Sequence, residues 1–439
     1  MTATPLRLSV LGAGYLGATH AACMAELGHE VVGIDTDADK VALLEQGEPP
    51  FFEPELQPLL RKHVESGRLR FSTALPDAAD ADVHFVCVGT PQLPGRPAAD
   101  LSQVEAVVSG LCEVLRPGAV VAGKSTVPVG TATALRERVK EACPSADLAW
   151  NPEFLREGYA VADTLSPDRI VVGSPSPETV ERLREVYREP VANGTPFLKV
   201  GLETAELVKV AANSFLATKI SFINAMAEVC EATGADVVEL ADAVGHDDRI
   251  GHRFLKAGLG FGGGCLPKDI RAFQARAGEL GLGRAVSFLG EMDDINTRRR
   301  QRTVDLAHEV LGGRVAGHRV AVLGAAFKPN SDDVRDSPAL DVACQLHLHG
   351  ADVVVYDPEA TGPAQRRVPD LAYAPSLASA VEGADLVLLL TEWSEFVAMD
   401  PSAIGGMVAG RVIIDGRNVL SPEAWRAAGW EFRALGRGH

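Results

Sequence analysis

Short apolar segments alternate with helical patterns along the first 200 residues of the chain. The pattern predicts a buried strand at Leu6–Leu11, a glycine-containing turn at 12–17 and a helix at Ala18–Leu27 that ends before Gly28. Further strands are expected at Val31–Ile34, Val83–Val88, Ala119–Ala122 and Ile170–Val172. Strands that alternate with helices are typical of a parallel sheet covered by helices.

The same alternation returns late in the chain. Strands are expected there at His318–Leu323, Val353–Tyr356, Leu386–Leu390 and Val412–Asp415. Between the two regions, Leu202–Ala232 contains neither proline nor glycine. A helix of that length suits the joining of domains or subunits better than the covering of a sheet.

These patterns predict an α/β protein with two Rossmann-like, doubly wound parallel-sheet domains joined by a long central helix. A chain of 439 residues exceeds what one hydrophobic core usually organises. We place the first sheet domain at 1–200, the helical connector at 201–305 and the second sheet domain at 306–439.

The formal net charge is −17, which argues against a nucleic-acid or anionic-membrane partner, because either needs a concentrated basic face. One basic run, Arg298–Arg300 with Arg302, lies in the helix-like stretch Asp294–Val310. We interpret that run as a solvated helix face.

Seven cysteines without a Cys-x-x-Cys pair predict neither a disulfide framework nor a zinc site, and no metal is expected. A reducing cytoplasm fits this usage best. Arg7 interrupts the first apolar run, so the pattern of a signal peptide is missing. No stretch approaches eighteen uninterrupted apolar residues, so no membrane span is expected.

The turn after the first strand has the spacing of a dinucleotide site. Gly12 permits a tight turn, Gly14 lets a pyrophosphate approach the backbone, and Gly17 allows close packing of helix on strand. Asp35 ends the next strand, where a carboxylate can bond the ribose 2′-hydroxyl and repel a 2′-phosphate. The combination predicts NAD rather than NADP as the cofactor.

Two later strands end in hydroxyl side chains, Thr90 and Thr126. Ligands bind at this carboxyl edge of open α/β sheets. Each threonine could equally belong only to a turn or to a helix cap.

Cys265 follows a run of glycines and precedes Pro-Lys-Asp, ending in Lys268 and Asp269. We expect the glycines at 262–264 to leave room for a bulky substrate beside the thiol. A neighbouring cation favours the reactive thiolate, so Cys265 is a candidate nucleophile. The alternative, a buried cysteine that acts as a small hydrophobic residue, suits Cys87 and Cys230 better.

Lys209 and Asn213 lie four residues apart on the long predicted helix, and therefore on one face. The stripe continues through the apolar residues Leu216, Ile220 and Ala227. Buried polar groups need partners. A snorkelling lysine and an asparagine with one structural bond remain an equal alternative.

Two other segments concentrate polar side chains. Asn151–Glu157 is either a functional cluster or a solvated helix start. The loop Phe327–Pro338 carries two cations suited to a pyrophosphate or carboxylate, although it could be a plain surface loop.

Taken together, these segments resemble the UDP- and GDP-sugar dehydrogenase family, and within it the UDP-glucose 6-dehydrogenases. The resemblance covers nearly the whole chain. The matching segments, in the family's order, are Gly12–Gly17, Asn151–Glu157, Lys209–Asn213, Arg249–Lys256, Phe261–Asp269 and Phe327–Pro338.

The resemblance implies a four-electron oxidation of a nucleotide sugar's primary alcohol to a carboxylate, with two hydrides passed to two NAD. Cys265 would capture the aldehyde as a thiohemiacetal and later hold a thioester that water cleaves. The resemblance also implies that the second sheet domain binds the UDP-sugar. A homodimer or larger homo-oligomer would form through the central helix, with Arg249 reaching a neighbouring subunit's site.

The resemblance further assigns individual residues. The catalytic group is Cys265, Lys209, Asn213, Asp269, Thr126 and Glu153. In this group Lys209 and Asn213 would stabilise an oxyanion. Asp269 and Thr126 would position a water, and Glu153 would assist proton transfer. The cofactor group is Gly12, Gly14, Tyr15, Leu16, Gly17, Asp35, Lys40, Thr90, Thr126, Glu157, Lys268 and Arg335. The substrate group is Glu153, Phe154, Leu155, Glu157, Lys209, Asn213, Arg249, Phe254, Lys256, Gly260, Phe261, Gly262, Cys265, Phe327, Lys328 and Arg335.

Gly264 departs from the family pattern, since many relatives have serine before the nucleophile. This departure bears on substrate fit, so GDP-mannose or a UDP-N-acetylhexosamine stays open as the substrate. A two-electron hydroxyacid dehydrogenase would share the glycine turn and the Lys-x-x-x-Asn helix but has no use for the thiol. A non-catalytic NAD-binding sensor would need none of the clustered side chains.

Overall fold

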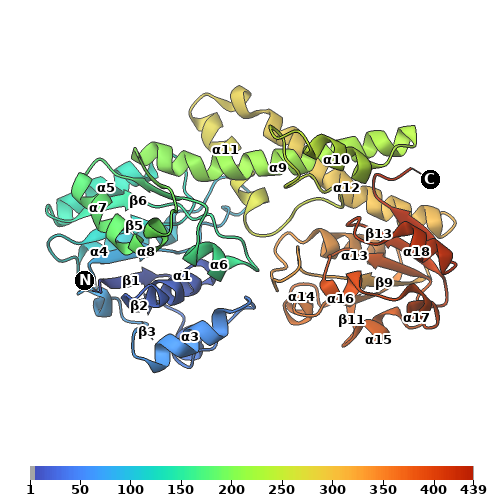
Figure 1. Ribbon diagram of the computed structural model, residues 1–439, viewed down its shortest axis with the longest axis horizontal. Helices are drawn as coiled ribbons and strands as arrows, with labels where there is room; N and C mark the ends of the chain where they lie inside the picture. Colours follow the sequence, from blue (N-terminus) through green and yellow to red (C-terminus); the bar gives the residue numbers. More distant parts are fainter. Residues whose placement is uncertain (1–4, 439) are drawn as a thin grey trace. The chain divides into compact units, whose positions relative to one another are not determined.

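The computed structural model describes residues 5–438, which divide into two compact units (Figure 1). The first unit contains the chain up to Ala212 together with Ala275–Gly281. The second contains Asn213–Gln274 and the chain from Leu282 onward. The boundaries of the three expected domains stay a prediction.

The first unit is built on an eight-stranded sheet with the order β3-β2-β1-β4-β5-β6-β7-β8. Neighbouring strands are parallel except β6 and β7, which pair in opposite directions. The strands are β1 Arg7–Leu11, β2 Glu30–Ile34, β3 Leu69–Ser72, β4 Val83–Val86, β5 Val120–Gly123, β6 Asp147–Trp150, β7 Ile170–Gly173 and β8 Phe197–Val200.

Helices cover both faces of this sheet, because alternate strand residues point to opposite sides. Val10 packs in a core with α1, whereas Leu11 packs in a second core with α4 and α5. The helices are α1 Tyr15–Glu26, α2 Ala38–Glu45, α3 Leu56–Glu65, α4 Ser102–Cys112, α5 Thr131–Ala142, α6 Ala160–Leu165, α7 Pro177–Val186 and α8 Arg188–Ala192. The predicted α/β fold is confirmed.

Helix α1 begins at Tyr15, three residues before the predicted start. Gly14 is its N-cap, and the carbonyl of Gly14 accepts the N–H of Ala18 at 2.9 Å. The turn therefore needs only residues 12–14, and the rest of the glycine pattern is already helical.

The second unit contains a six-stranded parallel sheet with the order β11-β10-β9-β12-β13-β14. Its strands are β9 Arg319–Leu323, β10 Asp352–Tyr356, β11 Ala372–Tyr373, β12 Leu386–Leu389, β13 Val412–Asp415 and β14 Glu431–Ala434. This order repeats that of the first six strands of the other sheet, and it is the order of a dinucleotide-binding fold.

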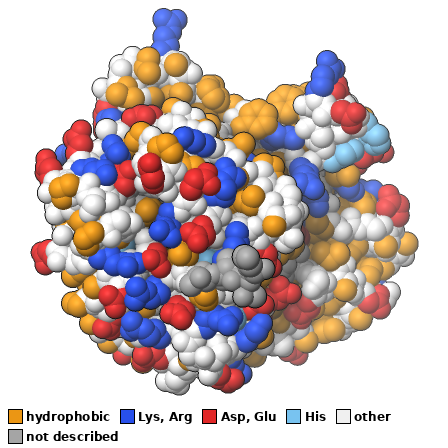
Figure 2. Space-filling view, turned by 60° about the vertical axis from the view of Figure 1, so that its left-hand side comes forward, with side chains coloured by type: hydrophobic (Ala, Val, Ile, Leu, Met, Phe, Trp, Pro, Cys, Tyr) orange, Lys and Arg blue, Asp and Glu red, His pale blue; other side chains and the backbone are white. Residues whose placement is uncertain are grey.

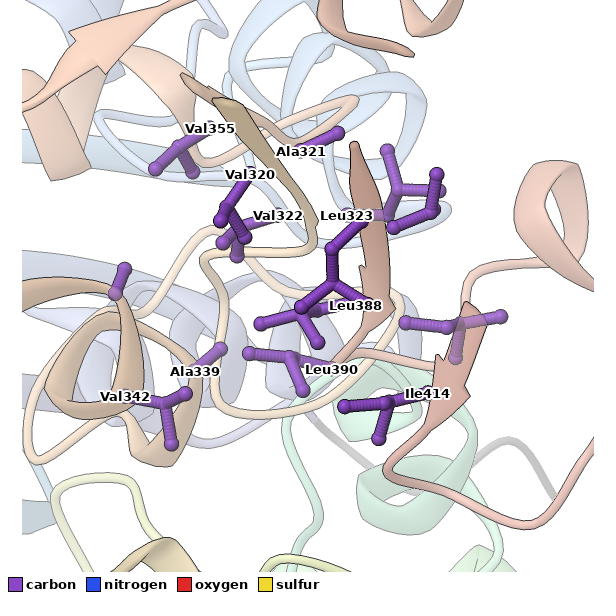
Figure 3. Close-up of a cluster of buried hydrophobic side chains, with 14 of the residues drawn as sticks. Val320, Ala321, Val322, Leu323, Ala339, Val342, Val355, Leu388, Leu390 and Ile414 are labelled. Atoms are coloured by element: carbon purple, nitrogen blue, oxygen red, sulfur yellow. The ribbon is translucent and has the colours of Figure 1, made fainter. Parts of the chain in front are cut away.

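The core of the second sheet forms around β9, as Figure 3 shows. Val320 and Leu323 meet Val355 of β10 and Leu388 of β12 in one buried cluster, which Val342 of α13 joins. The helices around this sheet are α13 Pro338–Leu348, α14 Thr361–Arg367, α15 Leu377–Val381, α16 Ser394–Val397, α17 Pro401–Gly405 and α18 Pro422–Ala427.

The long helix predicted at Leu202–Ala232 is confirmed as α9, Leu202–Thr233, with 32 residues. Three further helices belong to this central part of the chain: α10 Val237–Gly245, α11 Leu266–Glu279 and α12 Phe288–Val310. None of the helices within residues 5–438 is long and apolar enough to cross a membrane.

The sequence predicts that the basic run Arg298–Arg302 forms a solvated helix face. This prediction is wrong for Arg299 and Arg300, which are buried. Arg299 is fully buried, and its guanidinium pairs with Glu231 of α9 at 2.9 Å. Arg302 pairs with the same carboxylate at 2.8 Å, and Arg300 pairs with Asp336 at 2.8 Å. The charge run gave no sign of these acids, because they lie tens of residues away in the sequence.

Figure 2 shows basic and acidic side chains interspersed over the face that it displays. That mixture agrees with the negative net charge, and it offers no concentrated basic surface on this face.

Glu231 links two arginines and also accepts the N–H of Gly436 at 2.8 Å. Replacement Glu231→Ala leaves Arg299 buried without its counter-charge, so we expect the free energy of unfolding to fall by about 3 kcal/mol. Urea unfolding of the full chain measures this change.

The matched control is Glu309→Ala, which removes the half-exposed second partner of Arg302 and should cost less than about 1 kcal/mol. Burial opposes ionisation of Glu231, but Arg299 and Arg302 outweigh it and lower its pKa. The stabilisation is therefore present above the ordinary glutamate pKa and is lost as the pH falls through the lowered one. Equal losses in the two variants would contradict this account.

Candidate active site

The turn after β1 has the close packing that its glycines predict. Gly12 has φ +90°, and its N–H donates to Ile34 at 2.8 Å. A Cβ at position 17 would overlap the carbonyl oxygen of Gly12, so helix and turn approach too closely for any side chain. A Cβ at Gly14 would meet nothing within 4 Å. The backbone is thus open at the start of α1, and the N-terminus of a helix is where a phosphate group can bind.

Asp35 lies directly after β2 and belongs to the same turn. Its Oδ2 accepts the N–H of Ala13 at 2.8 Å and contacts the ammonium of Lys40 at 3.0 Å. Its Oδ1 accepts the N–H of Asp37 at 3.0 Å. A carboxylate held this way beside a glycine turn fits the ribose hydroxyls of NAD.

The second unit repeats this turn with a different outcome. Gly324 follows β9 with φ +111°, and its N–H donates to Tyr356 at 2.8 Å. Asp357 then accepts the N–H groups of Ala325 at 2.7 Å and Ala326 at 2.9 Å, and the indole N–H of Trp393 at 3.0 Å. Asp357 is almost fully buried, so its carboxylate serves the protein and not a ribose.

The two strand-end threonines meet, as the topology requires. The hydroxyl of Thr90 donates to the backbone carbonyl of Thr126 at 2.8 Å. Since β4 and β5 are neighbours in the sheet, both segments lie at one edge of the first unit.

Glu53, which the sequence analysis did not single out, contacts the predicted cofactor residue Tyr15. It is buried, and it accepts the hydroxyl of Tyr15 and the N–H groups of Gly158 at 2.6 Å and Ala160 at 2.7 Å. Burial first and Glu53 second raise the pKa of Tyr15. Glu53 thus ties the start of α1 to the segment after Glu157, itself a nearly buried residue. No local motif in the sequence marks Glu53.

Lys124 is a second residue that the sequence analysis did not identify, and it contacts the predicted catalytic residue Glu153. Its buried ammonium pairs with Glu153 at 2.9 Å, and the other oxygen of Glu153 accepts the N–H groups of Phe154 at 2.7 Å and Leu155 at 2.9 Å. Burial alone would raise the pKa of Glu153, but Lys124 and these N–H groups outweigh it and lower that pKa. In the sequence, the one feature that could have pointed to Lys124 is its position directly after the apolar strand β5.

The segment Asn151–Glu157 forms a loop. The alternative interpretation from the sequence, a solvated helix start, is therefore wrong. In this loop the ring of Phe154 faces two cations. The guanidinium of Arg169 lies 3.9 Å from the ring centroid, and the ammonium of Lys209 lies 5.7 Å from it. Lys209 is therefore gathered with Phe154 and Glu153 in the first unit.

In the second unit, exposed Cys265 immediately precedes α11. One turn later, the buried carboxylate of Asp269 accepts the side-chain amide of Asn213 at 2.7 Å and the ammonium of Lys268 at 2.6 Å. The N–H of Asp269 donates to the carbonyl of Cys265 at 2.9 Å. Three predicted residues thus form one cluster beside the candidate nucleophile. Cys87 and Cys230 are buried, as expected.

The expectation that glycines 262–264 leave room for substrate is wrong. A Cβ at Gly262 would overlap the carbonyl of Asp336, and one at Gly264 would overlap the guanidinium of Arg335. A Cβ at Gly263 would lie 2.8 Å from the ring of Phe327. The space is already filled by the loop Phe327–Pro338, a neighbour that the sequence does not predict.

Further residues hold this nucleophile loop and were not predicted. The side chain of Asn296 accepts the N–H of Phe261 at 2.7 Å and donates to its carbonyl at 2.9 Å. Arg417 donates to the carbonyls of Gly260 at 3.3 Å and Phe327 at 3.2 Å. Both lie far from Phe261 in the sequence and carry no motif.

The remaining predicted substrate residues are not gathered in this way. Arg249 is exposed and pairs with its neighbour Asp247 at 2.6 Å. Phe254, with φ +65°, and Lys256 are both exposed. Arg335 pairs with Asp333 at 2.7 Å, and the ammonium of Lys328 lies 5.3 Å from the centroid of the Phe327 ring. Their functional roles stay predictions.

Comparison with known proteins identifies the family. Residues 6–191 match the NAD binding domain of the UDP-glucose/GDP-mannose dehydrogenase family, residues 203–298 its central domain and residues 321–422 its UDP binding domain. The chain belongs to this family. It is therefore an NAD-dependent oxidoreductase with a nucleotide-sugar substrate.

Relatives and solved structures agree with that assignment. UDP-glucose 6-dehydrogenase TuaD of Bacillus subtilis is 41% identical, over 98% of this chain and 93% of its own length. A UDP-glucose dehydrogenase structure from Pyrobaculum islandicum is 38% identical with a TM-score of 0.90, covering 99% of both chains. A UDP-D-ManNAc dehydrogenase structure from Pyrococcus horikoshii is 28% identical with a TM-score of 0.85, covering 98% of this chain and 99% of the other.

Replacement Asp35→Asn should weaken NAD binding about tenfold to a hundredfold, because the charged acceptor for the ribose is lost. Lys40, 3.0 Å from Asp35, keeps its charge and would attract a 2′-phosphate, so the preference for NAD over NADP should narrow. Titration calorimetry with both cofactors measures the change.

The control is Asp39→Asn, an exposed acid in the first turn of α2 that should leave both affinities unchanged. An Asp35→Asn protein with native cofactor preference would refute the assigned role of Asp35.

Proposed function

We propose that this protein oxidises UDP-glucose to UDP-glucuronate in a four-electron reaction that uses Cys265 as covalent nucleophile. The observation that carries the proposal is the exposed Cys265 beside a cluster in which Lys268 and the buried Asn213 contact the buried carboxylate of Asp269. A two-electron dehydrogenase would have no use for that thiol.

When bound, NAD supplies the hydride acceptor for each of the two oxidations. The Cys265 thiol adds to the aldehyde carbon formed in the first oxidation, which makes a C–S bond and a thiohemiacetal. The second oxidation turns this adduct into a thioester. Water then breaks the C–S bond, which releases the carboxylate and restores the thiol. The covalent bond retains the aldehyde between the two oxidations.

The polar residues around the thiol receive the roles that the family resemblance assigns. Lys209 and Asn213 would stabilise the developing oxyanion, since a positioned ammonium and amide can hold negative charge. Asp269 and Thr126 would position the attacking water. Glu153 would assist the proton transfers.

The binding residues follow the same division. The domain at 1–200 would hold NAD through the glycine turn and Asp35, with further contacts from Tyr15, Leu16, Lys40, Thr90 and Glu157. Lys268 and Arg335, which lie outside that domain, would be two further cofactor contacts. The domain at 306–439 would hold the UDP part of the substrate with Phe327, Lys328 and Arg335. The sugar and the uridine would be held by Phe154, Leu155, Phe254, Lys256 and the loop Gly260–Gly262.

Relatives support UDP-glucose over the other sugars. UDP-glucose 6-dehydrogenases match nearly the full chain at about 40% identity, for example the Rhizobium meliloti enzyme at 40% over 98% of this chain and 100% of its own. The UDP-D-ManNAc dehydrogenase and GDP-mannose dehydrogenase structures are each 28% identical. A reducing cytoplasm, in which a thiol stays reduced, is the location that we propose.

The deciding experiment counts NADH. Purified protein with UDP-glucose should form two NADH for each UDP-glucuronate. The rate with UDP-glucose should exceed the rate with GDP-mannose or with a UDP-N-acetylhexosamine. One NADH with free aldehyde as the product would refute the four-electron chemistry. A faster rate with another sugar would overturn only the substrate assignment.

Replacement Cys265→Ser should remove the second oxidation and lower turnover to uronate by a factor of about a thousand or more. Cys112→Ser, a half-buried thiol on α4, is the matched control and should retain full turnover. Full turnover in Cys265→Ser would favour a hydroxyacid-dehydrogenase type of reaction.

We also propose a homodimer formed along α9, with Arg249 reaching the neighbouring subunit's site. Phe215, Phe222 and Val229 lie seven residues apart on that helix and are 67%, 47% and 52% exposed. Seven-residue spacing places them on one stripe. An exposed apolar stripe of this kind suits burial against a second copy of the same helix.

Phe222→Asp places a charge in the middle of that stripe, and we expect sedimentation velocity to show a shift from dimer to monomer. Leu348→Asp, at an 81% exposed position on α13, is the control and should leave the dimer intact. An unchanged dimer in Phe222→Asp would contradict the proposed interface.

A further inference from the structure

Lys124 and Glu153 form an ion pair within the first unit, at the edge where β5 and β6 end. Each N–H of the Lys124 ammonium has an acceptor: Glu153 at 2.9 Å, Asn151 at 3.2 Å and the hydroxyl of Tyr187 at 3.3 Å. The ammonium also lies 5.9 Å from the ring centroid of Phe85 and 5.8 Å from that of Tyr187. The lysine is therefore fully satisfied inside the protein.

The titratable groups around this pair are uncharged at neutral pH. Burial lowers the pKa of His20 on α1 well below its usual value, and burial raises the pKa of Cys87, after β4, to about 12. Burial likewise raises the pKa of Tyr187 to about 12 and that of Cys23 on α1 above its usual value. Lys124 and Glu153 are thus a charged pair among these four described groups.

Two further cations approach the pair from the side of Phe154. Arg169 and Lys209 face the ring of Phe154, the residue after Glu153. Neither forms an ion pair with Glu153 among the described residues, so Lys124 is the direct counter-ion of that carboxylate.

The Glu153 carboxylate retains one open acceptor site. A carboxylate has about four such sites. Lys124 takes one, and the N–H groups of Phe154 and Leu155 take two more. The Glu153 side chain is 17% exposed whereas that of Lys124 is 4% exposed, so the carboxylate is the more accessible member of the pair.

We propose that Lys124 is a positioning residue for thioester hydrolysis: it keeps Glu153 ionised and oriented, with one acceptor site left to align the attacking water. This inference rests on the proposed function. The water oxygen bonds to the thioester carbon and the C–S bond breaks. One water proton ends on the Cys265 sulfur, and the carboxylic acid releases the other to solvent. Glu153 orients the water and does not retain a proton.

The test is the variant Lys124→Met, which removes the charge and keeps the length of the side chain. Buried without its counter-ion, Glu153 should be protonated at neutral pH and could no longer act as an ionised acceptor. Hydrolysis at pH 7, followed as uronate release in single turnover, should fall at least about tenfold. The acid limb of the pH profile should move upward by about three to five units, into the neutral range.

NADH formation in the same single turnover should fall less than uronate release, because the proposed role of Lys124 is in the hydrolysis that follows the oxidations. Lys124→Arg should restore much of the hydrolysis rate at neutral pH. Lys140→Met, which removes a half-exposed lysine 3.8 Å from Asp147, is the control and should keep the wild-type profile. A Lys124→Met protein whose rate falls equally at every pH would overturn the proposal and leave a purely structural role.

A second measurement does not depend on the folding of the Lys124 variant. Infrared difference spectra of wild type against Glu153→Gln report the carboxylate band of Glu153 across pH. The proposal expects this band to persist below the ordinary glutamate pKa of about 4.3. Titration of Glu153 at or above that value would overturn it. Failure of wild type to form NADH with any nucleotide sugar would instead refute the proposed function.

Discussion

Parallel strands end at a common edge of their sheet, and the chemistry of the first unit depends on that constraint. Each strand must be followed by a crossover before the next parallel strand can begin, so the residues after successive strands collect at one edge. Gly12 follows β1, Asp35 follows β2, Lys124 follows β5 and Asn151 follows β6. Lys124 and Asn151, 27 positions apart, thereby become hydrogen-bonded neighbours without a local motif that links them.

The two sheets show how one backbone design diverges. In both units a glycine with positive φ follows the first strand, and an aspartate after the second strand accepts an N–H of that turn. In the first unit the carboxylate of Asp35 keeps Lys40 as a charged neighbour at the edge of the sheet. In the second unit the indole of Trp393 closes over Asp357. The same turn therefore builds a cofactor site in one unit and a structural anchor in the other.

Buried charges determine much of the remaining organisation. Lys124 with Glu153, Asp269 with Asn213 and Lys268, and Arg299 with Glu231 each place charge away from water, where an unpaired group is costly. Each pair also connects segments distant in sequence or orders a loop at the site. The free-energy cost of leaving one partner buried without its counter-charge therefore keeps these segments together.

The amino-acid sequence alone predicts the α/β fold, the glycine turn of the NAD-binding domain, the long helix α9 and the candidate nucleophile. These features depend on local periodicity, on glycine spacing or on a compact motif such as the residues around Cys265. The folded structure was needed to show that Arg299 is buried, that glycines 262–264 pack against the loop containing Arg335, that Lys124 pairs with Glu153 and that Glu53 accepts the N–H of Gly158. Burial and ion pairing depend on partners contributed by distant segments, and a local pattern carries no record of which segments the fold brings together.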